Sequence, residues 1–191
     1  MKLLKLLFVI CVISVFASAR LGEALERTEV VIARLKKQLK DPDHEVRIKG
    51  IKGLGDIGPE ARIALNELTE ILEKDKVAEV RIEAASCVGA IFFRCKIEPH
   101  EKKVVFVLAK TMRKDDDLLV RRSACYALRM MERDRGARDA VPDFFELMRD
   151  KKEDPVLREW AADAFVRLVG PESKKLVPTL VEMFGRNRPS A

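Results

Sequence analysis

The sequence predicts an all-α fold, a right-handed α-solenoid of about four and a half antiparallel helical hairpins. The main observation is an internal repeat: DPDHEVRIKGIKGLGDI, starting at Asp41, recurs in related form from Asp75, Asp115 and Glu153. Within each copy the apolar residues follow helical spacing. The composition, with 6% aromatic residues and much Ala, Leu, Glu, Lys and Arg, also favours helix.

The first element is a signal-like segment. It has the order of a secretory signal peptide: two lysines (Lys2, Lys5), an apolar run (6–16) and an A-x-A step made by Ala17, Ser18 and Ala19. The run is shorter than the roughly 20 residues of a membrane-spanning helix, so we expect cleavage after Ala19. The alternative is an uncleaved N-terminal anchor that holds the array at a membrane. We therefore expect residues 1–19 to be a signal peptide, residues 20–191 to be a single repeat domain, and the protein to be secreted or periplasmic.

The net charge and the cysteine content limit which partners and which metal or haem sites the chain can be expected to have. Without Lys2 and Lys5 the formal charge falls from +6 to +4, and the basic residues are scattered, so nucleic acid is not the expected partner. Three cysteines remain in no metal or haem spacing: Cys87, Cys95 and Cys125. Buried free thiols are the expected state, and one disulfide is the alternative.

The four copies align in columns that share a chemical character. The first column is apolar and consists of Val46, Val80, Val120 and Leu157. The second column lies four residues later and is small: Gly50, Ala84, Ala124 and Ala161. The third column lies eight residues after the first and is apolar again: Leu54, Val88, Leu128 and Phe165. These offsets put all three columns on one helical face. The small column predicts that a neighbouring helix approaches closely.

Partner helices occupy the stretches between the copies. Five segments with apolar residues at three- and four-residue steps begin at Val30, Ile63, Lys103, Ala140 and Leu176. The two Gly-Pro-Glu joints, at 58–60 and 170–172, each end one helix and start another. The count is about nine helices, which makes four hairpins and a closing half.

This pattern resembles HEAT repeats over essentially the whole of residues 20–191. The resemblance rests on the D-x5-VR-x3-[AG]-x3-L motif, the Gly-Pro-Glu joints and the V-P-x-[FL] helices. It implies a ladder of Asp and Arg side chains between adjacent repeats, formed by Asp41 and Arg47, Asp75 and Arg81, Asp115 and Arg121, and Arg158. In the fourth copy Lys152 takes the Asp position, which departs from the family pattern. The aspartates also have a second interpretation, as caps of the helices that follow them.

GLGDIG, at 53–58, matches the G-x-G-x-x-G pattern of dinucleotide-binding loops. Its residues occupy repeat columns, however, where Gly53 aligns with Cys87 and Ala127. We therefore expect Gly53 and Gly55 to be helical and to tolerate Ala, and Gly58 to end the helix before Pro59. No nucleotide site is expected.

Metal and nucleophilic catalysis also lack a residue set. His44-Glu45 and His100-Glu101 resemble the His-Glu steps of deoxyhypusine hydroxylase, but that family needs four pairs inside its inner helices. Cys95 and His100 lack a third ligand. No nucleophile motif is present. The sequence therefore predicts no enzyme activity, no cofactor, no metal and no small-molecule substrate.

An extended concave surface is what such an array offers, and these surfaces bind proteins or peptides. The outward positions in the last two copies collect residue types enriched at binding hot spots: Tyr126, Met130, Trp160 and Arg167. We expect them to bind a protein or peptide partner; the alternative is that Tyr126 and Trp160 extend the core. A second functional hypothesis is an enzyme accessory, because the bilin lyases of phycobiliproteins also resemble HEAT arrays.

Overall fold

The computed structural model describes residues 27–93, 95, 97, 98, 101–131 and 135–170. In this part of the chain the structure is an all-α solenoid without strands. The expectations for residues 1–19, including the A-x-A step of Ala17 and Ala19 with cleavage after Ala19, and for the closing half-repeat lie outside the described residues.

Four hairpins make up the array. They are the helical residues 27–38 with α2 (His44–Ile57), α3 (Leu65–Lys74) with α4 (Ala78–Phe92), α5 (Lys102–Lys114) with α6 (Leu118–Met130), and α7 (Val141–Arg149) with α8 (Pro155–Val169). Two 3-10 segments, Gly58–Ala64 and Arg135–Ala140, precede α3 and α7.

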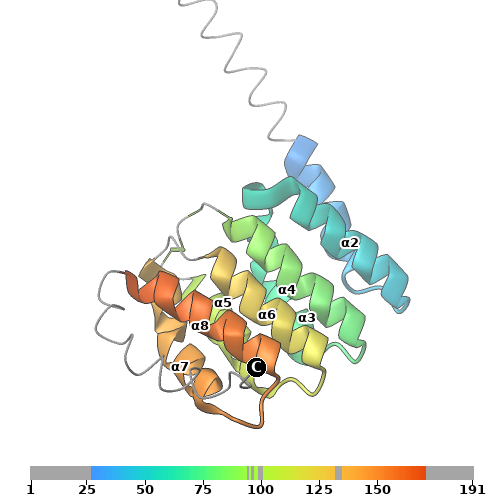
Figure 1. Ribbon diagram of the computed structural model, residues 1–191. Helices are drawn as coiled ribbons and strands as arrows, with labels where there is room; N and C mark the ends of the chain where they lie inside the picture. Colours follow the sequence, from blue (N-terminus) through green and yellow to red (C-terminus); the bar gives the residue numbers. More distant parts are fainter. Residues whose placement is uncertain (1–26, 94, 96, 99–100, 132–134, 171–191) are drawn as a thin grey trace, which may run out of the picture.

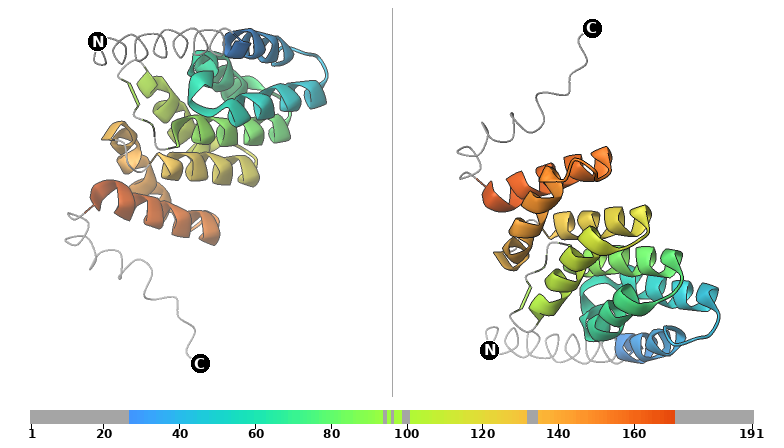
Figure 2. Two further views of the ribbon diagram at one scale, coloured as in Figure 1. Left: turned by 90° about the horizontal axis from the view of Figure 1, so that it is seen from above. Right: turned by 90° about the horizontal axis from the view of Figure 1, so that it is seen from below.

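The hairpins stack into two layers. Helices α2, α4, α6 and α8 lie side by side in one layer, which faces the viewer in Figure 1, and α3, α5 and α7 form the other (Figures 1 and 2). We call the first the inner layer and the second the outer layer. The repeat copies identified in the sequence are the inner-layer helices.

The core lies between the layers and follows the predicted columns. The small column is buried throughout, and so is the third column apart from small residual exposure at Phe165. In the first column Val46 differs, because it is only half-buried while its three counterparts are fully buried. Val46 lies at the beginning of the described array, where no earlier hairpin covers it.

The predicted close approach is present at Gly50. A Cβ atom there would lie 2.9 Å from Cβ of Gln38 and 3.1 Å from the carbonyl oxygen of Leu35. Only a residue without a side chain lets the two helices of the first hairpin pack at this distance.

GLGDIG lies within and at the end of α2, as its column positions predict. Gly53 and Gly55 are helical, and Gly58 ends the helix with φ 74°. The segment from Gly58 forms 3-10 turns with Pro59 near its start, so α3 begins at Leu65 and not at Ile63. The strand and phosphate-binding turn of a dinucleotide site are not formed by these residues.

The capping hypothesis for the ladder aspartates is wrong in detail. Asp41, Asp75 and Asp115 each accept the backbone N–H of the residue two positions later, at 2.9–3.0 Å, which stabilises the turn before the helix. The helix caps are Asp43 and Asp117, whose carboxylates accept amide hydrogens in the first turn of α2 and α6. Val77, at the equivalent position before α4, makes no side-chain cap.

Candidate interaction surface

The outward positions of the inner layer form a continuous surface. The positions three, six and ten residues after the first column give twelve residues on the outward side of the inner helices, and each is exposed or half-buried: Lys49, Lys52, Asp56, Glu83, Ser86, Ala90, Ser123, Tyr126, Met130, Trp160, Asp163 and Arg167. The first half of this surface is charged or small, and the second half, on α6 and α8, carries the aromatic rings of Tyr126 and Trp160 together with Met130 and Arg167.

Tyr126 and Trp160 lie against each other across α6 and α8. Their ring centroids are 6.5 Å apart and the ring planes are tilted by 56°, a favourable aromatic geometry. Tyr126 remains 42% exposed, whereas Trp160 is half-buried and packs against the hydrophobic core. The sequence left two interpretations open, a binding surface and an extension of the core. Trp160 extends the core, and the aromatic pair still faces solvent, so each interpretation describes one part of the pair.

Two arginines share one carboxylate beside the aromatic pair. The guanidinium of Arg129 stacks over the Tyr126 ring, 5.1 Å from its centroid, and its Nη1 lies 3.3 Å from Oδ2 of Asp163. Arg167 pairs with the same carboxylate at 2.9 Å, one helical turn along α8. The structure thus connects Arg167 to the aromatic pair through Asp163 and Arg129.

Arg129 was not singled out from the sequence, and Asp163, although at an outward position, was not among the residues expected to bind a partner. The signal was available, because Arg129 follows Tyr126 by three residues and Asp163 precedes Arg167 by four, and both intervals bring side chains together on a helix. Met130 is half-buried four residues after Tyr126, on the same side of α6. We call Tyr126, Arg129, Met130, Trp160, Asp163 and Arg167 the aromatic patch.

The arginine–carboxylate ladder crosses between hairpins near the start of the inner helices. Arg47 donates Nε and Nη2 to Asp75 at 2.8 and 3.0 Å, and Arg81 does the same to Asp115 at 2.8 Å for both bonds. Each arginine also donates Nη1 to the carbonyl oxygen of the Asp in its own copy, at 2.8 Å. These hydrogen bonds to Asp115 raise the pKa of Arg81 above its usual value, although burial works in the opposite direction.

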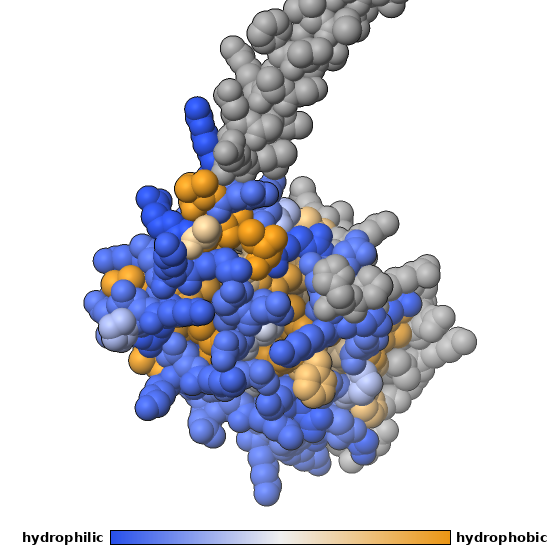
Figure 3. All heavy atoms as spheres, turned by 180° about the vertical axis from the view of Figure 1, so that it is seen from behind, coloured by the Kyte–Doolittle hydropathy of each residue, from blue (hydrophilic) through white to orange (hydrophobic). Residues whose placement is uncertain are grey.

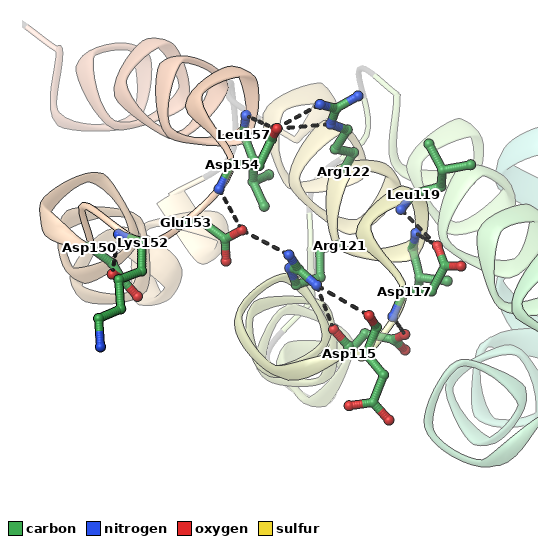
Figure 4. Close-up of polar contacts among 12 residues, drawn as sticks. Asp115, Asp117, Leu119, Arg121, Arg122, Asp150, Lys152, Glu153, Asp154 and Leu157 are labelled. Carbon is green, nitrogen blue, oxygen red and sulfur yellow. Dashed lines mark hydrogen bonds and ion pairs between the residues drawn. The ribbon is translucent and has the colours of Figure 1, made fainter. Parts of the chain in front are cut away.

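In the fourth copy the carboxylate is supplied by Glu153. Arg121 donates Nη2 to Glu153 at 2.8 Å and Nη1 to the carbonyl oxygen of Asp115 at 2.9 Å (Figure 4). Lys152 takes no part through its side chain in the contacts shown there; its amide donates to Asp150. Arg158 donates Nε to the carbonyl oxygen of Met148 at 3.1 Å.

Asp154 joins the same region to α8. Its carboxylate caps α8 by accepting the amide of Leu157 at 2.8 Å, and it pairs with Arg122 at 2.8 Å (Figure 4). Burial opposes ionisation of this carboxyl group, but the hydrogen bonds from Arg122 and Leu157 outweigh burial and lower its pKa.

A further ion pair, between Arg62 and Glu101, links the second and third hairpins. Arg62 lies in the 3-10 segment and donates Nε to Glu101 at 2.8 Å, and it also stacks over Phe92 at 5.1 Å. Glu101 is only 7% exposed. A hollow of about 310 Å³ lies beside the pair, between α3 and α5. Because Arg62 and Glu101 form an ion pair with each other, we interpret the pair as a structural contact between repeats.

Three thiols lie in the described residues, those of Cys87, Cys95 and Cys125, and all three are free. Cys87 and Cys125 are buried, and burial raises the pKa of each to about 12, so both are protonated near neutral pH. Cys95 differs from the expectation because it is partly exposed at the end of α4.

His44 is exposed; its Nδ1 lies 3.8 Å from Oδ1 of Asp43 and its Nε2 lies 3.5 Å from Oε1 of Glu45. His100 lies outside the described residues. Within the described ranges, His, Cys, Asp and Glu side chains form no group of three or more suited to a metal ion. No helix in those ranges has the length and apolar character needed to span a membrane.

The comparison with protein families agrees with this geometry. Three overlapping segments, residues 17–89, 32–129 and 105–190, match the family model for HEAT repeats. No curated protein matches the chain in sequence. Given three matches that together span most of the chain and a stack of helical hairpins with the Asp–Arg contacts between them, this chain belongs to the HEAT-repeat family.

Proposed function

We propose that this protein is a non-catalytic interaction module that binds a protein or peptide through the aromatic patch on its inner layer. HEAT repeats generally mediate protein–protein contacts, and this is the coarse function that the family assignment supports. The observation that carries the finer proposal is the exposed Tyr126–Trp160 pair with Arg129 stacked upon it.

Close packing of the inner helices supports a concave inner layer. A Cβ atom at Gly89 of α4 would lie 3.1 Å from Cα of Ala127 in α6. Small residues at this contact shorten the spacing of the inner helices, and a stack with one shorter layer curves toward that layer. The aromatic patch would then lie on the concave side.

The opposite face is mostly hydrophilic. Seen from behind, hydrophilic side chains cover most of it, and hydrophobic groups show between them (Figure 3). Several charges there are already paired between adjacent outer helices, for example Lys110 with Glu73 and Arg113 with Asp143, both at 3.0 Å.

The patch favours a ligand segment with an apolar side chain next to an acidic one. An apolar or aromatic side chain packs on the exposed edge of Tyr126 and Trp160. An acidic side chain pairs with Arg129, whose Nη1 lies 3.3 Å from the Asp163 carboxylate that it shares with Arg167. A peptide with these two features is the chemistry that the patch recognises.

The experiment is affinity capture from the native host, followed by a binding titration with the partner. We expect Tyr126→Ala with Trp160→Ala to weaken binding at least tenfold while the far-ultraviolet circular dichroism stays unchanged. Because Trp160 packs on the core, Arg129→Gln is the second variant; its side chain is exposed enough to be replaced without loss of the fold, and we expect a similar loss.

Lys49→Ala is the matched control, because Lys49 occupies the position of Trp160 in the first copy. It should bind like the unmodified protein. If Lys49→Ala weakens binding and Arg129→Gln does not, the patch has been placed on the wrong half of the surface. If none of these variants changes partner binding, the inner layer is not the binding surface.

Export is part of the proposal. The basic, apolar and A-x-A order of residues 1–19 supports a cleaved signal peptide, a secreted or periplasmic protein and a mature N-terminus at Arg20. N-terminal sequencing of the protein from its native host tests this. A start at Met1 in the membrane fraction would show an anchored array instead.

A further inference from the structure

The apolar part of the inner surface extends beyond the aromatic patch, to the beginning of α6 and α8. At 100° per residue, four residues of α6 fall within about 60° of one another on the side away from the core: Leu119, Ser123, Tyr126 and Met130. Leu119 is 56% exposed, and Val156, at the same position of α8, is 39% exposed. Together with Val156 and Trp160, the four residues form what we call the α6–α8 lane, along two helices that lie side by side (Figure 1).

The first two inner helices carry charges at these positions. The counterparts of Leu119 and Val156 are Glu45 and Glu79, and both are exposed. A glutamate therefore suits the fold at this position, and the repeat pattern does not require an apolar residue there. The exposed Leu and Val of the last two hairpins are better explained by something that binds on the lane.

The lane has the dimensions of a short helix. From Leu119 to Met130 it extends along α6 for about 16 Å, at roughly 1.5 Å per residue. Its members follow one another at steps of four, three and four residues. An amphipathic helix presents its own apolar side chains at the same steps. A helix that lies along α6 can therefore place one apolar side chain beside each member.

An extended peptide backbone is poorly suited to the lane. The backbone N–H and C=O groups within α6 and α8 are already bonded inside each helix. Asn and Gln side chains can pair with both groups of an extended segment, but in the part of the chain that the structure describes these are Gln38 and Asn66, and neither lies on an inner-layer helix. An extended segment would bury backbone polar groups at a cost. A helix satisfies these groups internally.

Charge at one end of the lane favours one direction of such a helix. Arg129 and Arg167 lie in the last turn of α6 and of α8 and share the carboxylate of Asp163, which leaves one positive charge in excess. An acidic side chain is most favourable in the first turn of a helix, where the macrodipole is positive. A partner helix with its acidic first turn beside Arg129 runs antiparallel to α6.

We propose, on the basis of the peptide-binding function proposed above, that the partner supplies an amphipathic α-helix that lies along the α6–α8 lane, antiparallel to α6. Its apolar side chains, at positions i, i+4, i+7 and i+11, pack on Leu119, Tyr126 and Trp160. Its acidic first turn pairs with Arg129. The class of partner is therefore a short helix with an apolar face and an acidic N-terminal end.

The test is a titration of the full chain with a synthetic Ala-based peptide of about 16 residues, long enough to be partly helical in water. The peptide carries Leu at i, i+4, i+7 and i+11, and Glu in its first turn. Trp160 is the only tryptophan of the sequence, so its fluorescence reports occupancy of the lane. We expect a saturable change in this fluorescence. Leu119→Ser and Val156→Ser should each weaken binding at least about fivefold, because each removes an apolar contact.

Glu79→Ser, at the position of Leu119 in α4, is the matched control and should bind like the unmodified protein. Two further peptides test conformation and direction. A central Pro prevents helix formation, so this peptide should not bind. With Glu moved to the last turn, binding should weaken at least about fivefold. Equal binding of the Pro peptide or of the peptide with Glu in the last turn would overturn the proposal, as would unchanged fluorescence with the first peptide.

Binding of the native partner separates this inference from the proposed function. If Arg129→Gln weakens that binding and Leu119→Ser and Val156→Ser do not, the aromatic patch binds the partner and the helix along the lane is wrong. If none of these variants changes it, the proposed function itself is wrong. Unchanged far-ultraviolet circular dichroism of the variants shows that the fold is kept.

Discussion

Arg121 holds Glu153 through one hydrogen bond, from Nη2 to Oε1 at 2.8 Å, whereas Arg47 and Arg81 each hold an aspartate through two. The Nε atom of Arg121 is buried without a hydrogen-bond partner. An unsatisfied buried donor reduces what a contact contributes to stability. The three contacts of the ladder are therefore chemically similar but unequal.

The first prediction concerns this inequality. Arg81→Ala should destabilise the protein by about 1–3 kcal/mol, because it leaves the carboxylate of Asp115 largely buried without its partner. Arg121→Ala should cost less. Urea unfolding of both variants measures the difference, and a larger loss for Arg121→Ala would contradict the geometric account.

The second prediction uses Gly55 and Gly89, which occupy the same repeat position. Gly55→Ala should raise the free energy of unfolding by up to about 1 kcal/mol, since its new Cβ would meet Cys87 at an ordinary 3.7 Å. Gly89→Ala should lower it, because the Cβ would lie 3.1 Å from the backbone of Ala127. Thermal unfolding of the pair tests this; equal shifts would mean that α4 and α6 adjust freely.

Gly53→Ala forms the intermediate case. Its Cβ would approach Cδ2 of Leu35 to 2.8 Å, but this atom is the end of a flexible side chain and can move. We expect a smaller change than at Gly89, so the tolerance predicted from the sequence applies to Gly55 more fully than to Gly53.

The third prediction is a dependence of stability on pH at Asp154. The pKa of this carboxyl group is lowered from 3.8 in the folded protein, so its ion pair contributes stability above that value and loses it as the pH falls through the folded pKa. Asp154→Asn keeps a good capping side chain but removes the charge that pairs with Arg122.

At pH 7 the Asn variant should be less stable by about 1 kcal/mol, and the difference should shrink as the pH falls below 3.8 and through the lowered pKa of the folded protein. Chemical denaturation from pH 2 to pH 7 measures it. A difference that stays constant down to pH 2 would show that the charge of Asp154 does not contribute.

The fourth prediction concerns thiol reactivity. In a chain that begins at Arg20, a thiol reagent at pH 7.5 should label Cys95 quickly and Cys87 and Cys125 only after unfolding, because the latter two are buried with a pKa of about 12. Cys95→Ser should abolish the fast phase. Rapid labelling of all three thiols in the native protein would contradict the burial of Cys87 and Cys125.

The sequence by itself determined the fold class, the four inner helices and the helical nature of Gly53 and Gly55. These features are local or repeated: helical spacing marks the buried face of each helix, and four related copies show which residues are equivalent. The same information placed Tyr126, Met130, Trp160 and Arg167 on the outward side.

Tertiary structure decided which side chains meet. The sequence aligned Lys152 with the ladder aspartates, but Glu153 takes the contact because side-chain length and the path of the loop determine which carboxylate reaches Arg121. It could not give the tilt of Tyr126 against Trp160, the sharing of Asp163 by two arginines or the brace between Arg62 and Glu101. Those contacts depend on the distances between hairpins, which are set by packing across the whole stack and are not encoded in the spacing of residues along one helix.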